Sequence, residues 1–384
     1  MRISAALLAA CLFHVSPAVC AAQPQASRFT DRTESTSDEV TEVKGRVALE
    51  VAGQPVPKRF VLRYPAERSR WNGSLVIGAH GGSGGNNFDP TGKVIGTDET
   101  ALDDVIGRHA VAAGFAYASV DRDGAVSARD GLGLTNQFAD IAAAEVVARL
   151  GRAPARRYLV GLSMGGGITR IAAEDPSRPY AGTLIIAGAG GDLPTRVARQ
   201  AELAALWPDV DPRRHPGLTP TDPKVQAFAE AIGTPVAARR LWSYTATGAV
   251  NAASRLPQPP GENSTGRVYV PTIEVVGTWD DFVRKELLAY ARRVEPRALH
   301  RLYQVEGVWH MSGDDDGVQS FMYIATRMGL DPDVARAMGA GPSYLPAVRS
   351  AFDALVRWVE QGTPAPPNAV MQPGDALPSG QGLP

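Results

Sequence analysis

The strongest restriction on the fold comes from six short apolar runs that alternate, for the most part, with stretches of helical periodicity. Such runs are typical of buried strands, and helical stretches provide the crossovers that parallel strands need. Repeated in this way, the pattern predicts an α/β fold with a mostly parallel central sheet flanked by helices. We expect strands at 74–79, 115–120, 158–162, 183–187, 272–276 and 302–305, and helices at 101–112, 137–150, 168–174, 282–294 and 347–360.

Segments of different character flank this pattern. Residues 47–51 and 59–64 alternate, or nearly alternate, between apolar and polar side chains, which predicts a β-hairpin or meander. The polar residues before them predict a flexible lead-in over residues 23–43. Residues 362–384 are rich in Pro and Gly, which predicts a disordered tail. One α/β domain is therefore expected between residues 44 and 361.

The alternation breaks once, between about residues 192 and 267, where ten prolines occur. This segment is too long for a plain connection, and insertions of such length often serve as lids or binding segments. We therefore expect a cap insertion. Its large aromatic residues are candidates for lining a substrate cleft, although they can also form the private core of a small insertion: Trp207, Trp242 and Tyr244.

The composition is that of an ordinary folded protein, with 44% hydrophobic and 21% charged residues. There are 39 Lys and Arg against 40 Asp and Glu, so the formal net charge is −1, and no local run of basic residues offsets this balance. Because nucleic-acid binding depends on basic patches, we expect no nucleic-acid partner. The sequence gives no indication of oligomeric state.

Residues 1–22 have the layout of a secretory signal peptide, with Arg2, a short apolar stretch, and small residues up to Ala22. The apolar stretch is shorter than the roughly 20 residues that cross a bilayer, so no membrane span is expected. The expected location is periplasmic or secreted, and a lipoprotein anchor through Cys11 is the alternative. Since Cys11 and Cys20 are the only cysteines, a chain cleaved near Ala22 would contain no disulfide.

Gly161-Leu162-Ser163-Met164-Gly165 is the most informative short motif. It lies between an expected strand and an expected helix, which is the context of a nucleophile elbow. The sharp turn strains the backbone of the serine, and the glycines leave room for chain segments that pass close by. The amides at the start of the next helix point toward the place where an oxyanion would form. Ser163 is therefore the expected nucleophile, and the amide of Met164 is one expected oxyanion donor.

A glycine-rich turn of sequence HGGSGG occupies residues 80–85, directly after the strand expected at 74–79. Bare backbone amides in such a turn can approach a substrate oxygen, and Gly82 and Ser83 are the expected donors. A phosphate-binding loop is the alternative, but the Lys-Ser/Thr ending of a P-loop is missing. The turn is therefore interpreted as the other half of an oxyanion hole.

A serine nucleophile needs a base and an acid that orients the base. Of the six histidines, His310 lies in an expected loop just after the last expected strand, from which it can reach the edge of the sheet. Asp280 follows the strand expected at 272–276 and emerges at the same edge. Asp281 is better placed to cap the following helix, and Asp192 is a second candidate for the acid. The expected triad is Ser163, Asp280 and His310.

This chain order, with the elbow and the glycine turn, resembles the α/β-hydrolase superfamily. The likeness extends from about residue 44 to 361 and includes an insertion where that family commonly places its cap. It implies the α/β-hydrolase fold with a cap, a Ser-His-Asp triad and an acyl-enzyme, with no cofactor. The closing segment at 352–364 is similar to that of tannase and feruloyl-esterase-type hydrolases, although Leu162 and Met311 leave no cysteine beside the triad, where many of those enzymes have a disulfide.

The resemblance implies an exported serine hydrolase that cleaves carboxylic esters, and the aromatic insertion favours hydrophobic or aromatic esters. Trp309, beside His310, is a further candidate for substrate contact. A serine peptidase of the prolyl-oligopeptidase type shares the triad order, and a non-catalytic binding module is the non-enzymatic alternative. No metal is expected, because a His-Glu-x-x-His motif is missing and the acidic run at 314–316 is typical of a solvated loop.

Overall fold

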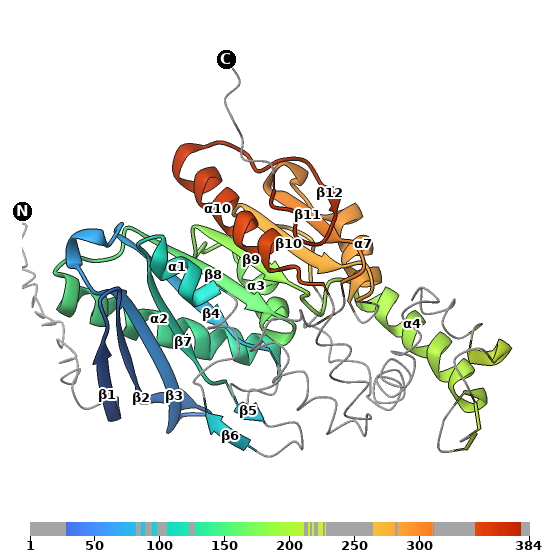
Figure 1. Cartoon of the computed structure of the whole chain (residues 1–384), viewed down its shortest axis with the longest axis horizontal. Helices are drawn as coiled ribbons and strands as arrows, with labels where there is room; N and C mark the ends of the chain where they lie inside the picture. Colours follow the sequence, from blue (N-terminus) through green and yellow to red (C-terminus); the bar gives the residue numbers. More distant parts are fainter. Residues whose placement is uncertain are drawn as a thin grey trace, which may run out of the picture.

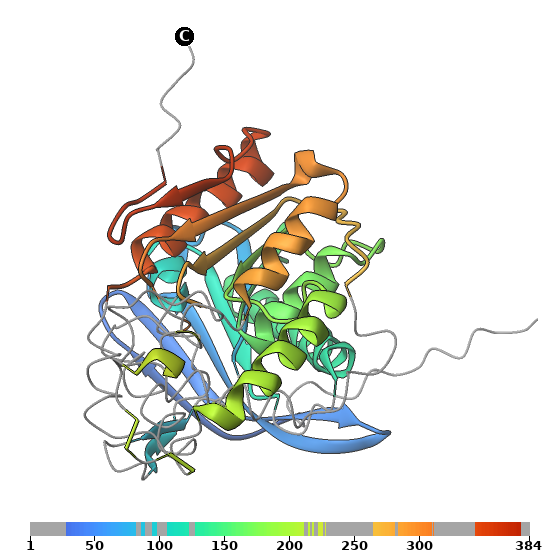
Figure 2. The ribbon, with the colours of Figure 1, turned by 90° about the vertical axis from the view of Figure 1, so that its right-hand side faces the viewer.

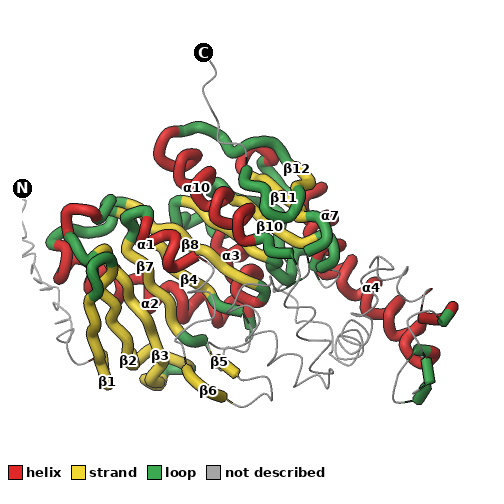
Figure 3. The backbone as a smooth tube through the Cα atoms, in the orientation of Figure 1, coloured by secondary structure: helices red, strands yellow, loops and turns green. Residues whose placement is uncertain are grey.

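The structure is a computed structural model of the 384-residue chain. It describes residues 28–81, 86–88, 94–97, 106–122, 127–210, 214–215, 217–218, 222–225, 227, 264–280, 283–308, 310 and 342–377. Within these residues, ten strands form one sheet in the order β1-β2-β3-β7-β4-β8-β9-β10-β11-β12 (Figures 1 and 3). The remaining pair, β5 (Asn86–Phe88) and β6 (Val94–Thr97), forms a separate two-stranded sheet.

The sheet combines an antiparallel end with a parallel centre. Strands β1, β2, β3 and β7 pair antiparallel to one another in that order. All pairings from β7 through β4, β8, β9, β10 and β11 to β12 are parallel. The strand bounds are β1 Phe29–Thr36, β2 Val40–Val51, β3 Gln54–Pro65, β4 Ser74–Ala79, β7 Ala116–Val120, β8 Arg156–Leu162, β9 Gly182–Ile186, β10 Thr272–Gly277, β11 His300–Val305 and β12 Ala369–Met371.

Helices cover both faces of this sheet, which confirms the predicted α/β class. Figure 2 shows α1 and α10 on one face, and α3, α7 and α4 on the other. The helix bounds are α1 Arg108–Ala112, α2 Ala128–Leu150, α3 Met164–Ala173, α4 Leu193–Leu206, α7 Arg284–Arg293 and α10 Leu345–Gln361, with 3-10 turns η2 Arg68–Arg70, η4 Trp207–Asp209 and η6 Arg297–Leu299.

Two large apolar clusters bury the two faces of the sheet. One packs alternate residues of the central strands, such as Val160, against Val111 of α1 and Phe352 of α10. The other packs the opposite face, including Leu159, against the apolar sides of α2 and α3. Since neighbouring residues of β8 face opposite clusters, the strand is apolar on both sides, as a buried parallel strand requires.

The expected flexible lead-in is wrong for residues 29–43. Residues of β1 pair with β2, and the side chains of β1 are exposed except at Phe29, which is half-buried. The ring of Phe29 packs 5.0 Å from that of Phe60, and Arg149 of α2 donates to Glu34 at 2.8 Å. A polar strand at a sheet edge needs only its backbone to pair, so its sequence gives no apolar alternation.

The expected disordered tail is also wrong for residues 362–377. Residues Ala369–Met371 form β12, which pairs parallel to β11 and closes that edge of the sheet. The side chains of Met371 and Leu377 are buried against the main cluster. The Asn368 side chain accepts the amide of Leu302 at 3.0 Å. The prolines are compatible with this order because they lie outside β12, in stretches without helix or sheet pairing.

Much of the expected cap lies outside the described residues. Its first part is α4, followed by η4. Both stems of the insertion are held by Arg293 of α7, which donates to the carboxylate of Asp192 at 3.0 Å and to the carbonyl oxygen of Ser264 at 2.9 Å. In the part of the chain that the structure describes, every helix is either too short or too polar to span a lipid bilayer.

Candidate active site

Ser163 lies in a sharp turn between β8 and α3. Its backbone angles are φ 55° and ψ −114°, a left-handed conformation that non-glycine residues rarely adopt. The turn is held by the end of β9 and the residues after it, because the Ser163 amide donates to the carbonyl oxygen of Ile186 at 2.9 Å and the Ser163 carbonyl oxygen accepts the amide of Ala189 at 3.1 Å. Strain of this kind persists where the surrounding structure enforces it and is frequent at active sites.

The glycines of the motif are required by close approach of the backbone. A Cβ on Gly165 would overlap the carbonyl oxygen of Ala79, at the end of β4. A Cβ on Gly161 would overlap the carbonyl oxygen of Gly165 and the hydroxyl of Thr169. The end of β4 therefore lies against the turn that carries Ser163.

His310 joins Ser163 to Asp280. The Nε2 atom of His310 lies 2.9 Å from Oγ of Ser163, and Nδ1 lies 2.8 Å from Oδ2 of Asp280. A carboxylate can only accept, so Nδ1 carries the proton and Nε2 accepts the serine hydroxyl. Asp280 and His310 are buried, whereas Ser163 is half-buried.

The environment of His310 has opposing effects on its basicity. Burial lowers the pKa of His310, but the charge of Asp280 and its hydrogen bond raise it, and the net direction is upward from the ordinary value. A base with a raised pKa binds a proton more strongly, which is the property needed to remove one from a hydroxyl.

The structure thus brings together Ser163, Asp280 and His310, as the sequence predicts. Asp192, the second candidate acid, does not contact His310. It accepts from Arg293 and from the amide and hydroxyl of Thr195 at the start of α4. Asp281 lies outside the described residues.

The turn after β4 is fixed by the buried side chain of His80. Its Nε2 accepts the amide of Arg122 at 2.9 Å, so Nδ1 carries the proton and donates to the carbonyl oxygen of Gly81 at 2.6 Å. The guanidinium of Arg122 in turn donates to the carbonyl oxygen of His80. Burial, together with the charge of Arg122, lowers the pKa of His80 to about 3, so its imidazole is neutral in neutral solution.

The expected oxyanion donors are only partly described. Met164 is the first residue of α3, and its side chain is 56% exposed beside Ser163. Gly82 and Ser83 lie outside the described residues. Gly81 precedes them, and a Cβ on it would lie 3.5 Å from the Cβ of Ser163. Gly81 therefore lies beside the serine, and the oxyanion hole formed by Gly82, Ser83 and Met164 stays a prediction.

Most of the residues expected to contact substrate lie outside the described residues. These are Trp242, Tyr244 and Trp309. The backbone of Trp207 opens η4, directly after α4. That these aromatic side chains line a substrate cleft stays a prediction.

Three residues near the site were missed by sequence reasoning. The Tyr344 hydroxyl, at the start of α10, donates to the carbonyl oxygen of His310 at 3.0 Å. Arg170 of α3 and Glu274 of β10 form a fully buried ion pair behind the serine turn. A charged residue in the middle of an apolar strand, as Glu274 is, could have indicated the pair, whereas nothing in the local sequence marks Tyr344.

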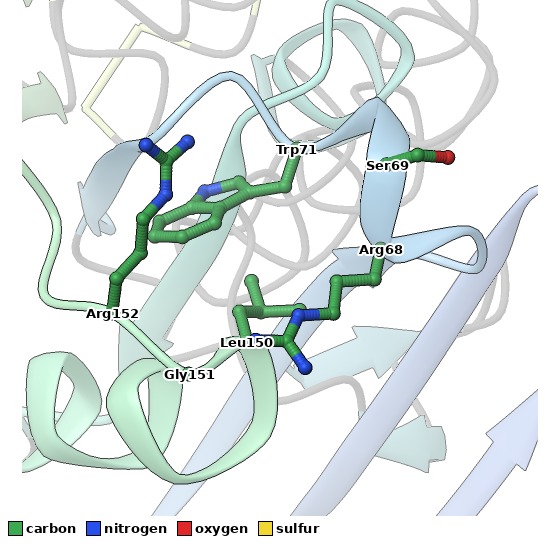
Figure 4. A pocket seen from close by; sticks show the side chains of 6 residues that line it. All are labelled: Arg68, Ser69, Trp71, Leu150, Gly151 and Arg152. Atoms are coloured by element: carbon green, nitrogen blue, oxygen red, sulfur yellow. The ribbon is translucent and has the colours of Figure 1, made fainter.

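A pocket of about 490 Å³ lies at the other end of the sheet (Figure 4). Its lining comes from segments that precede the amino ends of β4 and β8 and includes Arg68, Trp71, Gly151 and Arg152. The guanidinium of Arg152 lies over the Trp71 ring, 4.8 Å from its centre. Gly151 caps the C-terminus of α2, where the helix dipole favours positive charge, so the two arginines stabilise this end of the helix.

Among the described residues, no cluster of three or more His, Cys, Asp or Glu side chains could hold a metal ion.

A family model described as an alpha/beta hydrolase domain matches residues 168–377, which is more than half of the chain. The chain belongs to this alpha/beta hydrolase family. The match includes Asp280 and His310 and begins after Ser163, so the position of the serine in this hydrolase rests on the elbow geometry and its hydrogen bond to His310. No curated protein matches the sequence.

Solved structures with a similar fold include several esterases. Feruloyl esterase B from Aspergillus oryzae has 13% sequence identity and a TM-score of 0.48, with 88% of each chain covered. Vibralactone cyclase has 15% identity and a TM-score of 0.49, with 85% of this hydrolase and 83% of that chain covered. The cell-wall-degrading esterase LipA from Xanthomonas oryzae has 13% identity and a TM-score of 0.45, with 80% and 96% covered. At these scores, no assignment of substrate rests on them.

Proposed function

We propose that this alpha/beta hydrolase is a serine esterase that cleaves carboxylic esters through an acyl-enzyme. The observation that carries the proposal is the continuous chain of hydrogen bonds from Ser163 through His310 to Asp280. A serine with this base and this acid can act as a nucleophile, and the same three groups in the same roles recur on unrelated folds.

In the first half of the reaction, Oγ of Ser163 attacks the ester carbonyl carbon while its proton passes to Nε2 of His310. The buried carboxylate of Asp280 stabilises the imidazolium that forms. The amide of Met164 and those of Gly82 and Ser83 are the proposed donors to the oxyanion. The tetrahedral intermediate then collapses, and His310 returns the proton to the departing alcohol.

In the second half, water replaces the alcohol. His310 takes a proton from the water, whose oxygen attacks the acyl carbon, and the proton returns to Ser163 as the carboxylic acid leaves. Each proton therefore moves through one nitrogen of His310, and the other nitrogen stays bonded to Asp280. The two halves use the same groups, so one substitution at Ser163 removes both.

The substitution Ser163→Ala tests the proposal. We expect kcat for a p-nitrophenyl ester to fall by about 10⁴- to 10⁶-fold with little change in the melting temperature, because the hydroxyl is half-buried and small. A fluorophosphonate probe should label the wild-type protein and not the variant. Ser350→Ala is a matched control, since its hydroxyl is also half-buried and accepts the amide of Leu377 rather than a group of the triad. If Ser163→Ala hydrolysed the ester at nearly the wild-type rate, Ser163 could not be the nucleophile.

The proposed substrates are hydrophobic or aromatic esters. The proposal is supported by the aromatic content of the insertion between residues 192 and 267, which follows the strand beside Ser163 in the sheet. A series of p-nitrophenyl esters with acyl groups from acetate to aromatic acids tests it, and we expect kcat/KM to rise with apolar acyl size. A matched anilide distinguishes an esterase from a peptidase, because only a peptidase would hydrolyse it at a comparable rate.

We also propose that the protein is exported, which is supported by the signal-peptide layout of residues 1–22. Fractionation of cells that express the full chain, followed by N-terminal sequencing, tests this. A periplasmic or secreted product beginning near Gln23 is the expected result. A product that begins at Cys11 and carries a lipid would show the lipoprotein alternative.

A further inference from the structure

The ion pair between Arg170 and Glu274 is the most deeply buried in the described part of the chain. Arg170 is 1% exposed and Glu274 is fully buried. The guanidinium donates from Nε to Oε1 at 3.2 Å and from Nη2 to Oε2 at 3.1 Å, which is a two-point contact. Burial raises the pKa of Glu274, but Arg170 and His300 outweigh it and hold the carboxylate ionised.

A pair of this kind is unexpected on grounds of stability alone. Removing two charges from water costs about as much as their attraction returns, and apolar side chains of similar volume often stabilise a core equally well or better. The pair joins strand β10 to the helix α3, which begins at the serine turn. The guanidinium of Arg170 also contacts groups outside the pair, and these contacts indicate a conformational role for it.

Those other groups are two carbonyl oxygens directly behind Ser163. Arg170 donates from Nη1 to the oxygen of Ala189 at 2.7 Å and from Nη2 to that of Gly188 at 3.0 Å. The Ala189 amide donates to the carbonyl oxygen of Ser163 at 3.1 Å. A continuous chain of hydrogen bonds therefore runs from Glu274 through Arg170 and the 187–189 segment to the backbone of the serine.

The 187–189 segment needs such support. Ala187 has φ 46°, a left-handed conformation that is strained for a residue with a side chain. A Cβ on Gly166 would overlap the Cα of Gly188, and a Cβ on Gly167 would lie 2.8 Å from the carbonyl oxygen of Ala189. The first turn of α3 and this segment are in direct contact, so a shift of one moves the other.

We infer that Arg170, held by Glu274, is a positioning residue that fixes the backbone of Ser163 in its strained conformation through the carbonyl groups of Gly188 and Ala189. The inference rests on the proposed nucleophilic role of Ser163. Arginine suits this task because its planar group carries five N–H donors in a fixed fork, whereas the single ammonium nitrogen of lysine cannot reach all four oxygens.

The test measures the reactivity of Ser163 under conditions in which the wild type and the variants are all folded. The double variant Arg170→Met with Glu274→Leu removes both members of the ion pair at once, so neither is left buried without the other, and it is expected to fold. We expect the second-order rate of labelling by a fluorophosphonate to fall by about 10- to 100-fold, because small misplacements of a nucleophile have effects of that size. For an ester substrate, kcat should fall while KM stays within a factor of about two.

Arg170→Lys is the second variant, since it keeps the charge that Glu274 needs and loses the fork. It should label more slowly than wild type at a temperature where both are folded. The matched control is Arg63→Met with Glu42→Leu, an Arg–Glu pair with an Nε–Oε2 distance of 2.5 Å on β3 and β2. This control should label at the wild-type rate even if its melting temperature falls.

The outcomes separate the two hypotheses. Slow labelling in both Arg170 variants and normal labelling in the control support the positioning role. Wild-type labelling by either folded Arg170 variant overturns it, and so does an equal loss in the control. If wild type itself fails to react at Ser163, the proposed function fails whatever the Arg170 variants show.

Discussion

The Nδ1 atom of His310 lies 2.8 Å from Oδ2 of Asp280, whose side chain has no exposed surface. A buried carboxylate is poorly screened by salt, so its charge acts strongly on the imidazole beside it. This contact orients the ring toward Ser163 and also raises the pKa of His310 above the ordinary value of 6.5. The two effects can be separated by substitution.

The first prediction concerns the pH dependence of hydrolysis. His310 must be neutral to accept a proton, so activity is lost as the pH falls through its pKa. We expect the acid limb of kcat/KM to have a midpoint above 6.5 in the wild type. In Asp280→Asn, burial acts on His310 without the opposing charge, so the limb should move to lower pH while kcat falls by about 10³- to 10⁴-fold.

Asp192→Asn is the control for this experiment, because Asp192 contacts Arg293 and Thr195 and not His310. It should retain the midpoint of the wild-type limb. An acid limb that stays in place in Asp280→Asn and moves in Asp192→Asn would show that Asp192, and not Asp280, is the acid that acts on His310. A profile of kcat/KM for one soluble ester over the acid range gives the answer.

The second prediction concerns stability in acid and His80. The pKa of His80 is about 3 in the folded protein, so between about pH 3 and pH 6.5 the unfolded chain binds a proton that the folded protein does not. The free energy of unfolding should therefore rise with pH through this range and level off above it. His80 contributes a slope of at most about 1.4 kcal/mol per pH unit.

His80→Asn removes this proton and also the acceptor for the amide of Arg122. We expect a flatter acid slope in urea unfolding experiments and a loss of about 1 to 2 kcal/mol at neutral pH. Because the turn after β4 lies against Ser163, kcat should also fall, by about 10- to 100-fold. An unchanged acid slope would show that His80 is protonated in the folded protein.

How much of this site is readable from the sequence depends on the kind of interaction. Ser163, Asp280 and His310 could be located because each follows, within a few residues, a short and mostly apolar strand, and parallel strands end at one edge. Arg170 could not, because its neighbours come from the segment after β9 (Gly188) and from β10 (Glu274), and only tertiary packing brings them together.

The errors at the two ends of the domain have a related cause. β1 is polar because it lies at the sheet edge with exposed side chains, and β12 is only three residues long. Neither strand has the periodic apolar pattern on which sequence-based reasoning depends. Both are held mainly by backbone pairing with β2 and β11, to which any sequence without many prolines can contribute.

The third prediction concerns the glycines of the elbow. Gly165→Ala places a Cβ against the carbonyl oxygen of Ala79, where only backbone can give way. We expect a loss of about 2 kcal/mol or more in the free energy of unfolding, and little ester hydrolysis from the folded fraction.

Gly133→Ala on α2 is the matched control, because nothing lies within 4 Å of the added Cβ. There the same change should stabilise the protein by about 0.5 to 1 kcal/mol. Similar effects at the two positions would contradict the close approach of β4 to the serine turn.

The fourth prediction separates support of His310 from general stability. The hydroxyls of Tyr344 and Tyr303 each donate to one backbone carbonyl oxygen, that of His310 at 3.0 Å and that of Pro366 at 2.6 Å. Both Tyr→Phe variants should lose about 1 kcal/mol in the free energy of unfolding, because each loses one hydrogen bond to a backbone carbonyl oxygen.

Only Tyr344→Phe should affect the reaction, because only this hydroxyl fixes the backbone of the base. Both donor and acceptor are buried, so water cannot easily replace the lost hydroxyl. We expect kcat for an ester to fall by about 3- to 10-fold with KM nearly unchanged, since the loss alters the aim of His310 toward Ser163 rather than substrate contact. Equal kcat values in the two variants would mean that the backbone of His310 is held in place without Tyr344.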